Sequence, residues 1–223
     1  MCFSPEADVV AGIVVSGIGI DALRHVRYTR EYPLASLPLV LGVHLLIEAF
    51  VWWDVTERIP GSMGRVAVWL YLAVALGVLP VLVPVAIVAI EPEERRRRVL
   101  APFVVAGAGV AALLSAALIT GPISADIEGC CLAYHLGPGY NDFMGALYVV
   151  VICMSLLASS HLHIVAFGVV NLAAVALLAW LLASGLASLW CAWAAVTSVL
   201  IAAYLRRARP ARTRSSSPRV AAG

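Results

Sequence analysis

The chain has 223 residues, of which 62% are hydrophobic and only 13% charged, whereas soluble domains carry about 25% charged residues. Its formal net charge of +2 is small and says little about partners. So much apolar surface excludes an ordinary soluble fold and indicates a membrane protein, for which hydrocarbon permits only helices or closed barrels. The apolar runs are too long for barrel strands, so the predicted fold is all-α, a polytopic bundle of transmembrane helices.

Seven apolar runs have about the length that a helix needs to cross a hydrocarbon core of about 30 Å. They are Ala7–Leu23, Leu34–Trp53, Val66–Ile90, Val99–Thr120, Phe143–Ser159, Ile164–Ala183 and Leu186–Leu205. Glu6 and Asp8 stand at the start of the first run, where a cleaved signal peptide would carry basic residues, so this run is predicted to be retained. Pro80 and Pro84 remove backbone donors from the third run and predict a kink there.

Arginine supplies all 15 of the Lys+Arg residues, so a retinal Schiff base, which needs lysine, is excluded. Thirteen arginines fall in alternate connections on one side of the predicted bundle, and only Arg58 and Arg65 fall on the other. Short cytoplasmic loops carry the basic excess in membrane proteins. The N-terminus is therefore predicted to lie outside and the C-terminus in the cytoplasm, in a multi-pass protein of the cell membrane.

The sequence divides into a seven-helix transmembrane domain, residues 1–205, and a basic tail, residues 206–223. Six arginines stand in the tail among Ala, Pro and Ser residues, a composition that cannot build a core and predicts disorder. The tail is expected to anchor the topology and to be attracted to anionic lipid headgroups. Membrane lipids are thus the predicted partners and nucleic acid is not; a homo-oligomer or a larger membrane complex stays open.

Small residues in two of the runs predict close packing of helices, because no bulky side chain separates the backbones. They are Gly12, Ser16, Gly17 and Gly19 in the first run and Gly107 and Gly109 in the fourth. We expect these positions to serve packing and not chemistry.

The second run contains two ionisable residues, His44 and Glu48, which share a helical face with Trp52 because the three are spaced by four residues. An ionisable group at membrane depth costs at least about 2.5 kcal/mol, so it normally faces the bundle interior and has a partner. A functional site and a purely structural His44–Glu48 pair, or a buried protonated carboxyl group, are both compatible with this pattern.

The longest connection, Gly121–Asp142, is predicted to lie outside and to be functional. It carries Cys130, Cys131 and His135, and no basic residue other than this histidine. Cys2 is expected on the same side, shortly before the first run. Its thiolate is a candidate ligand or nucleophile, and a disulfide from Cys2 to one of the two loop cysteines is the alternative.

A thiolate, two imidazoles and a carboxylate together make a plausible ligand set for zinc or another transition metal. The predicted metal ligands are Cys2, His44, Glu48 and His135, in a polar pocket near the outer face. If the pocket is catalytic, Glu48 is the expected catalytic residue, as ligand or general base in metal-dependent hydrolysis of a lipid-like or amide substrate. Haem is the weaker cofactor alternative, since His44 with His135 is the only nearby pair of axial ligands.

Two other classes of function stay open. A proton or metal transporter would use Glu48 and His44 as a relay. A non-catalytic structural or assembly subunit would hold Cys2 in a disulfide and Glu48 in a hydrogen bond.

Two short motifs resemble those of a bacterial family of polytopic membrane proteins that is known only as uncharacterised. They are Met1-Cys2-Phe3-Ser4 at the start and Leu46-Ile47-Glu48 followed by Trp52 in the second run. The sequence departs from that family at Ala49, where glycine is usual. The resemblance implies that Cys2, Glu48 and His135 are the residues to test, and it implies no activity.

Overall fold

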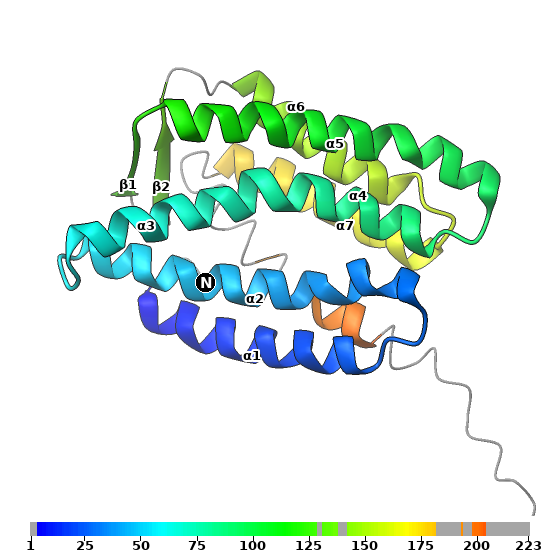
Figure 1. Ribbon diagram of the computed structural model, residues 1–223, viewed down its shortest axis with the longest axis horizontal. Coiled ribbons are helices and arrows are strands. Elements are labelled where there is room, and N and C mark those ends of the chain that lie inside the picture. Colours follow the sequence, from blue (N-terminus) through cyan, green and yellow to red (C-terminus); the bar gives the residue numbers. More distant parts are fainter. Residues whose placement is uncertain (1–3, 129–130, 138–141, 182–192, 194–197, 204–223) are drawn as a thin grey trace, which may run out of the picture.

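A computed structural model describes residues 4–128, 131–137, 142–181, 193 and 198–203, and Figure 1 shows a bundle of helices with roughly parallel axes. The α-helices of this part are α1 (Pro5–Arg24), α2 (Tyr32–Val55), α3 (Gly61–Leu72), α4 (Leu79–Ile90), α5 (Glu94–Thr120), α6 (Asp142–Leu157) and α7 (Leu162–Leu181). Its shorter elements are the 3-10 turn η1 (Thr29–Glu31), the π-helical turn η2 (Ala73–Val78) and the strands β1 (Ile123–Glu128) and β2 (Cys131–Leu136).

The sequence predicted an all-α bundle, and the structure is mostly helical, with one two-stranded sheet in the predicted loop between α5 and α6. Three helical segments are long and apolar enough to cross a membrane, and two shorter helices are apolar as well. The long ones are Thr29–Val55, Gly61–Ile90 and Glu94–Thr120, and the short ones are Phe143–Leu157 and Leu162–Leu177. The seventh predicted run, Leu186–Leu205, lies mostly outside the described residues, among which 193 and 198–203 are helical; the predicted tail, 206–223, lies outside them entirely.

The third predicted run forms one continuous helix from α3, η2 and α4. Because Pro80 has no N–H to donate to Leu76, a regular α-helical hydrogen bond is impossible there, and the preceding turn is wound as a π-helix. Pro84 likewise leaves the carbonyl oxygen of Pro80 without its helical donor. Helix α5 comes close to this oxygen, since a Cβ atom on Gly107 would lie 2.0 Å from it, whereas one on Gly109 would meet nothing within 4 Å.

Helices α1 and α2 pack against each other along a seam of small residues. A Cβ atom on Gly12 would lie 2.7 Å from the Leu46 side chain, and one on Gly19 would lie 2.3 Å from the backbone nitrogen of Leu39. A Cβ atom on Gly17 would meet nothing within 4 Å. The predicted close approach is therefore confirmed at Gly12 and Gly19 and wrong at Gly17.

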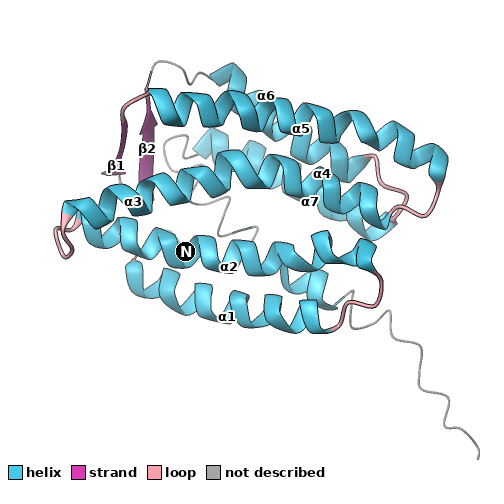
Figure 2. Cartoon of the chain, viewed as in Figure 1, coloured by secondary structure: helices cyan, strands magenta, loops and turns pink. Residues whose placement is uncertain are grey.

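The connection between α5 and α6 contains an antiparallel β-hairpin, shown in Figure 2. Ile123 lies opposite Leu136, and Glu128 lies opposite Cys131. Because side chains alternate between the two faces of a strand, Leu132 and its second neighbour along β2, Tyr134, share one face. Both pack against a core cluster of α2, α3 and α5, so the hairpin lies against one end of the bundle.

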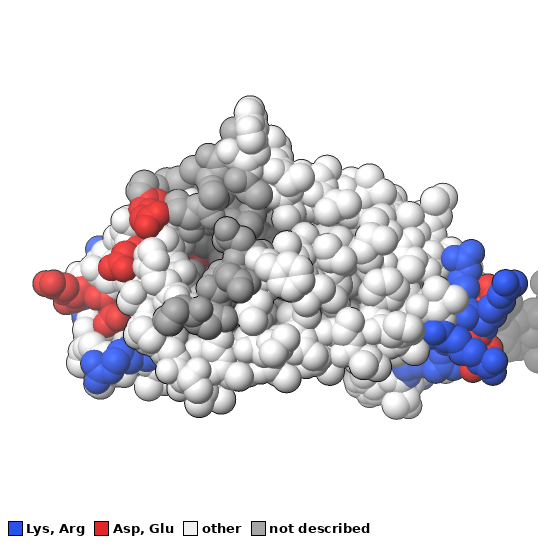
Figure 3. Space-filling view, turned by 90° about the horizontal axis from the view of Figure 1, so that it is seen from above, with Lys and Arg blue, Asp and Glu red and all other residues white. Residues whose placement is uncertain are grey.

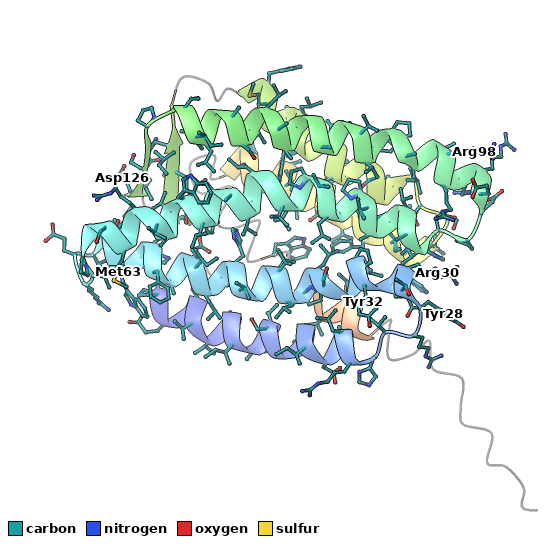
Figure 4. All side chains as sticks on the ribbon, viewed as in Figure 1. Tyr28, Arg30, Tyr32, Met63, Arg98 and Asp126 are labelled. Carbon is teal, nitrogen blue, oxygen red and sulfur yellow. The ribbon has the colours of Figure 1, made fainter. Side chains whose placement is uncertain are left out.

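Charged residues gather at the two ends of the molecule, with an uncharged belt between them (Figure 3). The arginine end carries Arg24, Arg27, Arg30 and Arg95 to Arg98; the hairpin end carries β1, β2 and the α2–α3 turn. Figure 4 shows Arg30 and Arg98 at one end and Asp126 at the other. A belt of exposed apolar side chains between charged ends fits a hydrocarbon layer with a polar surface on each side.

Candidate functional site

Helix α2 buries both ionisable residues that the sequence singled out. His44 and Glu48 are each 0% exposed and lie one helical turn apart. Counted from the last residue of α2, Val55, Glu48 lies about 10 Å and His44 about 16 Å along the axis, at about 1.5 Å per residue. The pair therefore belongs to the half of the helix that ends at the hairpin.

Three aromatic rings from three different elements form a continuous stack beside this pair. The His44 imidazole and the Tyr71 ring of α3 have centroids 4.0 Å apart and planes inclined by 19°. On its other side Tyr71 stacks on Tyr134 of β2, with centroids 4.3 Å apart and an interplanar angle of 8°. We call His44, Tyr71 and Tyr134 the ring stack, and it connects the middle of α2 to the hairpin.

The His44 imidazole is buried but not satisfied by hydrogen bonds. Neither Nδ1 nor Nε2 has a hydrogen-bond partner among the described residues. A buried polar atom without a partner costs about 1–3 kcal/mol, so native proteins nearly always provide one from protein, water or an ion. The two ring nitrogens of His44 are therefore the buried polar atoms of this site that the described residues leave without a hydrogen bond.

Asp8 adds a second buried carboxyl group, contributed by α1, and its side chain interacts with that of Trp52. Asp8 is not among the site residues predicted from the sequence. A signal was present, because Asp8 precedes Gly12 by one helical turn and both lie on the face that α1 buries.

His135 faces away from the ring stack. It follows Tyr134 in β2, so strand alternation turns its side chain to the opposite face, where it is 52% exposed. Its Nε2 atom lies 3.8 Å from a carboxylate oxygen of Asp126 and 3.7 Å from one of Glu128. The prediction that His135 joins His44 and Glu48 in one metal site is therefore not supported by the hairpin.

Two of the four predicted metal ligands, His44 and Glu48, lie one turn apart on the buried face of α2. In the described ranges, no group of three or more His, Cys, Asp or Glu residues is placed to hold a metal ion. His44 and Glu48 offer an imidazole and a carboxylate, which are zinc-type donors. Cys2, the predicted thiolate ligand, lies outside the described residues, as does Cys130, while Cys131 is a buried thiol.

A separate polar cluster lies at the arginine end, where the α4–α5 and α6–α7 connections meet. Glu91 is 1% exposed and accepts hydrogen bonds from the backbone N–H of Ser160, at 3.0 Å, and from its hydroxyl group. Burial by itself would raise the pKa of Glu91. The bonds from Ser160, with the nearby charges of His161 and Arg96, outweigh burial and lower this pKa below its usual value.

No curated protein and no solved structure matches the chain. A family model does match, over residues 1–216, and its description is a family of unknown function, DUF6629. This span includes every helix and both strands described above. The chain belongs to the family of unknown function DUF6629.

Proposed function

We propose that the protein binds a transition-metal ion such as zinc through His44 and Glu48, near the hairpin end of the bundle. The observation that carries this proposal is the His44 imidazole, which is fully buried and has no hydrogen bond to either ring nitrogen within the described chain. Imidazole nitrogen and carboxylate oxygen are ordinary zinc ligands, and an unsatisfied imidazole one turn from a buried carboxyl group supplies both.

The ring stack supports the same proposal. Stacking on Tyr71 fixes the plane of the His44 ring, and metal sites need ligands that are oriented in advance. Tyr71, Val51 and Leu132 are each 0% exposed around the stack, so bulk water is excluded on these sides. Cys2 is the proposed third ligand, whereas His135, on the exposed face of the hairpin, is not part of this proposal.

A bound metal ion would supply an activated water molecule or a polarised carbonyl group. Glu48 would then serve as ligand or general base, and the substrate class proposed is a lipid-like or amide compound that undergoes hydrolysis. By the positive-inside rule the arginine end lies in the cytoplasm, so the site would be reached from the exterior.

A second candidate function is proton carriage by the same pair, as in a transporter. The observation that favours it is the lack of a third metal ligand beside His44 and Glu48 among the described residues. Ionisable residues inside transmembrane helices commonly mark proton pathways. Proton carriage needs only groups that gain and lose a proton, and these two residues suffice for one step.

Metal analysis of the full-length protein in detergent tests the proposal. We expect about one zinc or other transition-metal ion per chain in the unsubstituted protein, and a loss of about 10-fold or more in affinity in Glu48→Gln and His44→Asn. Glu128→Gln is the matched control, because it makes the same change at an exposed carboxylate of the hairpin.

Each outcome decides between the candidates. Metal in the control and its loss in both site variants supports the metal site. Metal-free protein, or equal metal content in all four proteins, overturns it. An infrared band of a protonated carboxyl group that titrates in metal-free protein and disappears in Glu48→Gln would instead favour proton carriage. If no metal is bound and no such band titrates, a non-catalytic structural subunit is the remaining candidate.

A further inference from the structure

The turn between α1 and α2, at the arginine end, combines exposed arginines with exposed tyrosines. Arg27, Tyr28 and Arg30 are exposed, and Tyr32 at the start of α2 is 53% exposed. The Arg30 guanidinium lies 5.2 Å from the centroid of the Tyr28 ring, a cation–π arrangement. Figure 4 shows Tyr28, Arg30 and Tyr32 close together at this end.

The carboxylates of this region are engaged with other groups. The Oε2 atom of Glu31 accepts hydrogen bonds from the backbone N–H groups of Arg27, at 2.9 Å, and Tyr28, at 3.4 Å, and these bonds stabilise the turn. Asp21 lies 3.5 Å from the His25 ring. No ion pair with a carboxylate is formed by Arg30 within the part of the chain that the structure describes, and its charge is therefore available to a ligand.

Three arginines of a second group at the same end lie beside carboxylates three or four residues earlier in the chain. Arg96 lies 3.4 Å from a carboxylate oxygen of Glu93, while Arg97 and Arg98 lie 3.8 Å and 3.5 Å from oxygens of Glu94. Both groups of arginines lie at the same end of the bundle. Of the two, as far as the structure describes them, it is the α1–α2 turn that places arginine beside exposed aromatic rings.

We propose that the α1–α2 turn is a binding site for the phosphate group of an anionic phospholipid. The Arg30 guanidinium would meet the phosphate with charge-assisted hydrogen bonds, which guanidinium groups form well with phosphate oxygens, and the charge of Arg27 would add to the attraction. Tyr28 and Tyr32 would pack along the glycerol and the upper acyl chains, because tyrosine favours the membrane–water interface. This site is separate from the His44–Glu48 pair, and it stands if that pair binds no metal.

The test compares two variants with the same change of charge in full-length protein. Arg27→Gln/Arg30→Gln removes the arginines of the proposed site, and Arg97→Gln/Arg98→Gln removes two arginines of the second group, which has no exposed aromatic ring described beside it. Binding of phosphatidylglycerol to protein in neutral detergent is measured by native mass spectrometry, with phosphatidylcholine as the reference lipid. We expect about 30-fold weaker phosphatidylglycerol binding in the first variant, since each interfacial basic residue contributes about 1 kcal/mol and about 1.4 kcal/mol corresponds to tenfold. The second variant should bind as the unsubstituted protein does.

Two more measurements distinguish a lipid site from attraction to net charge and from a site for free phosphate. Tyr28→Ser/Tyr32→Ser keeps the charge and should also weaken phosphatidylglycerol binding. Soluble glycerol phosphate should fail to displace the lipid at equal concentration. Equal weakening in both arginine variants would mean attraction to net charge alone, and displacement by glycerol phosphate would mean a free-phosphate site; either result overturns the proposal.

Discussion

The imidazole ring of His44 stacks on the ring of Tyr71, with centroids 4.0 Å apart and planes inclined by 19°. This contact joins α2 to α3 across the interior, and Tyr134 extends it to the hairpin with a second stacked pair at 4.3 Å. Through Tyr134 the hairpin, which is remote from α2 in sequence, therefore contacts the same ring stack that contains the candidate ligand His44.

Removing the Tyr134 ring from the ring stack should destabilise the packing of the hairpin against the bundle. Tyr134→Ala is expected to lower the free energy of unfolding by about 1–3 kcal/mol, because a stacked aromatic pair contributes about 0.5–1.5 kcal/mol beyond the apolar area it buries. Tyr134→Phe keeps the ring and should lose much less. His135→Ala, at the exposed neighbour, is the control and should change stability by about 0.5 kcal/mol or less. Thermal unfolding in one detergent measures all three, and equal melting temperatures for the two alanine variants would contradict the stack.

Two glycines should tolerate alanine poorly while their near neighbours accept it. Gly19→Ala would place a Cβ atom 2.3 Å from the Leu39 backbone, and Gly107→Ala would place one 2.0 Å from the Pro80 carbonyl oxygen. Each should destabilise the protein by about 1–3 kcal/mol, the usual cost of overpacking. The matched controls are Gly17→Ala and Gly109→Ala.

A Cβ atom at either control position meets nothing within 4 Å, so these two variants should be neutral or slightly more stable. Melting temperatures of the four variants provide the comparison. If Gly17→Ala and Gly19→Ala behaved alike, the α1–α2 seam would be placed on the wrong face of α1.

The helices were predictable because the thickness of the hydrocarbon layer sets the length of every span. Local distortion was predictable only in part. Pro80 and Pro84 predict a loss of regular helical hydrogen bonds, but their positions alone do not predict that residues Ala73–Val78 are wound as a π-helix.

The candidate site was predictable on α2 and not across the hairpin. Spacing along one helix places His44 and Glu48 on a common face without tertiary information. For β2 the face of a residue depends on the register, and a shift of one position exchanges Tyr134 with His135. His135 was predicted to be a ligand because imidazole binds metals. The alternation of Leu132, Tyr134 and Leu136 instead indicates that Tyr134 is on the face of β2 that packs against the bundle.

The Glu91 cluster predicts a loss of stability in acid. Because the pKa of Glu91 is lower in the folded protein than its usual 4.5, its carboxylate stabilises the fold fully above about pH 4.5. This contribution is lost as the pH falls through the folded-state pKa. Glu91→Gln should therefore be less stable than the unsubstituted protein at pH 7, by about 1–3 kcal/mol for hydrogen bonds to a buried charge. Below pH 4.5 the difference between the two melting temperatures should shrink. Glu94→Gln, at an exposed carboxylate, should show little effect at either pH, and a pH-independent gap for Glu91→Gln would contradict the ionised carboxylate.

The orientation of the bundle can be tested with one cysteine at each end. Ser124 on β1 and Thr29 in η1 are both exposed, at the hairpin end and at the arginine end. If the arginine end lies in the cytoplasm, a membrane-impermeant thiol reagent applied to intact cells should label Ser124→Cys above the background of the native cysteines. Thr29→Cys should be labelled only after the cells are lysed.

Fusions at the two termini give an independent reading of the same topology. A reporter after Arg219 should be cytoplasmic, and a tag before Phe3 should be exterior, because the predicted number of spans is odd. Cys131, which is 1% exposed, should react with the reagent only after unfolding, so the native background should come chiefly from the other cysteines. Labelling of Thr29→Cys in intact cells would reverse the orientation. Both termini on one side would instead show that the count of spans is even, and the seventh run, Leu186–Leu205, would be the first to re-examine, since most of it lies outside the described residues.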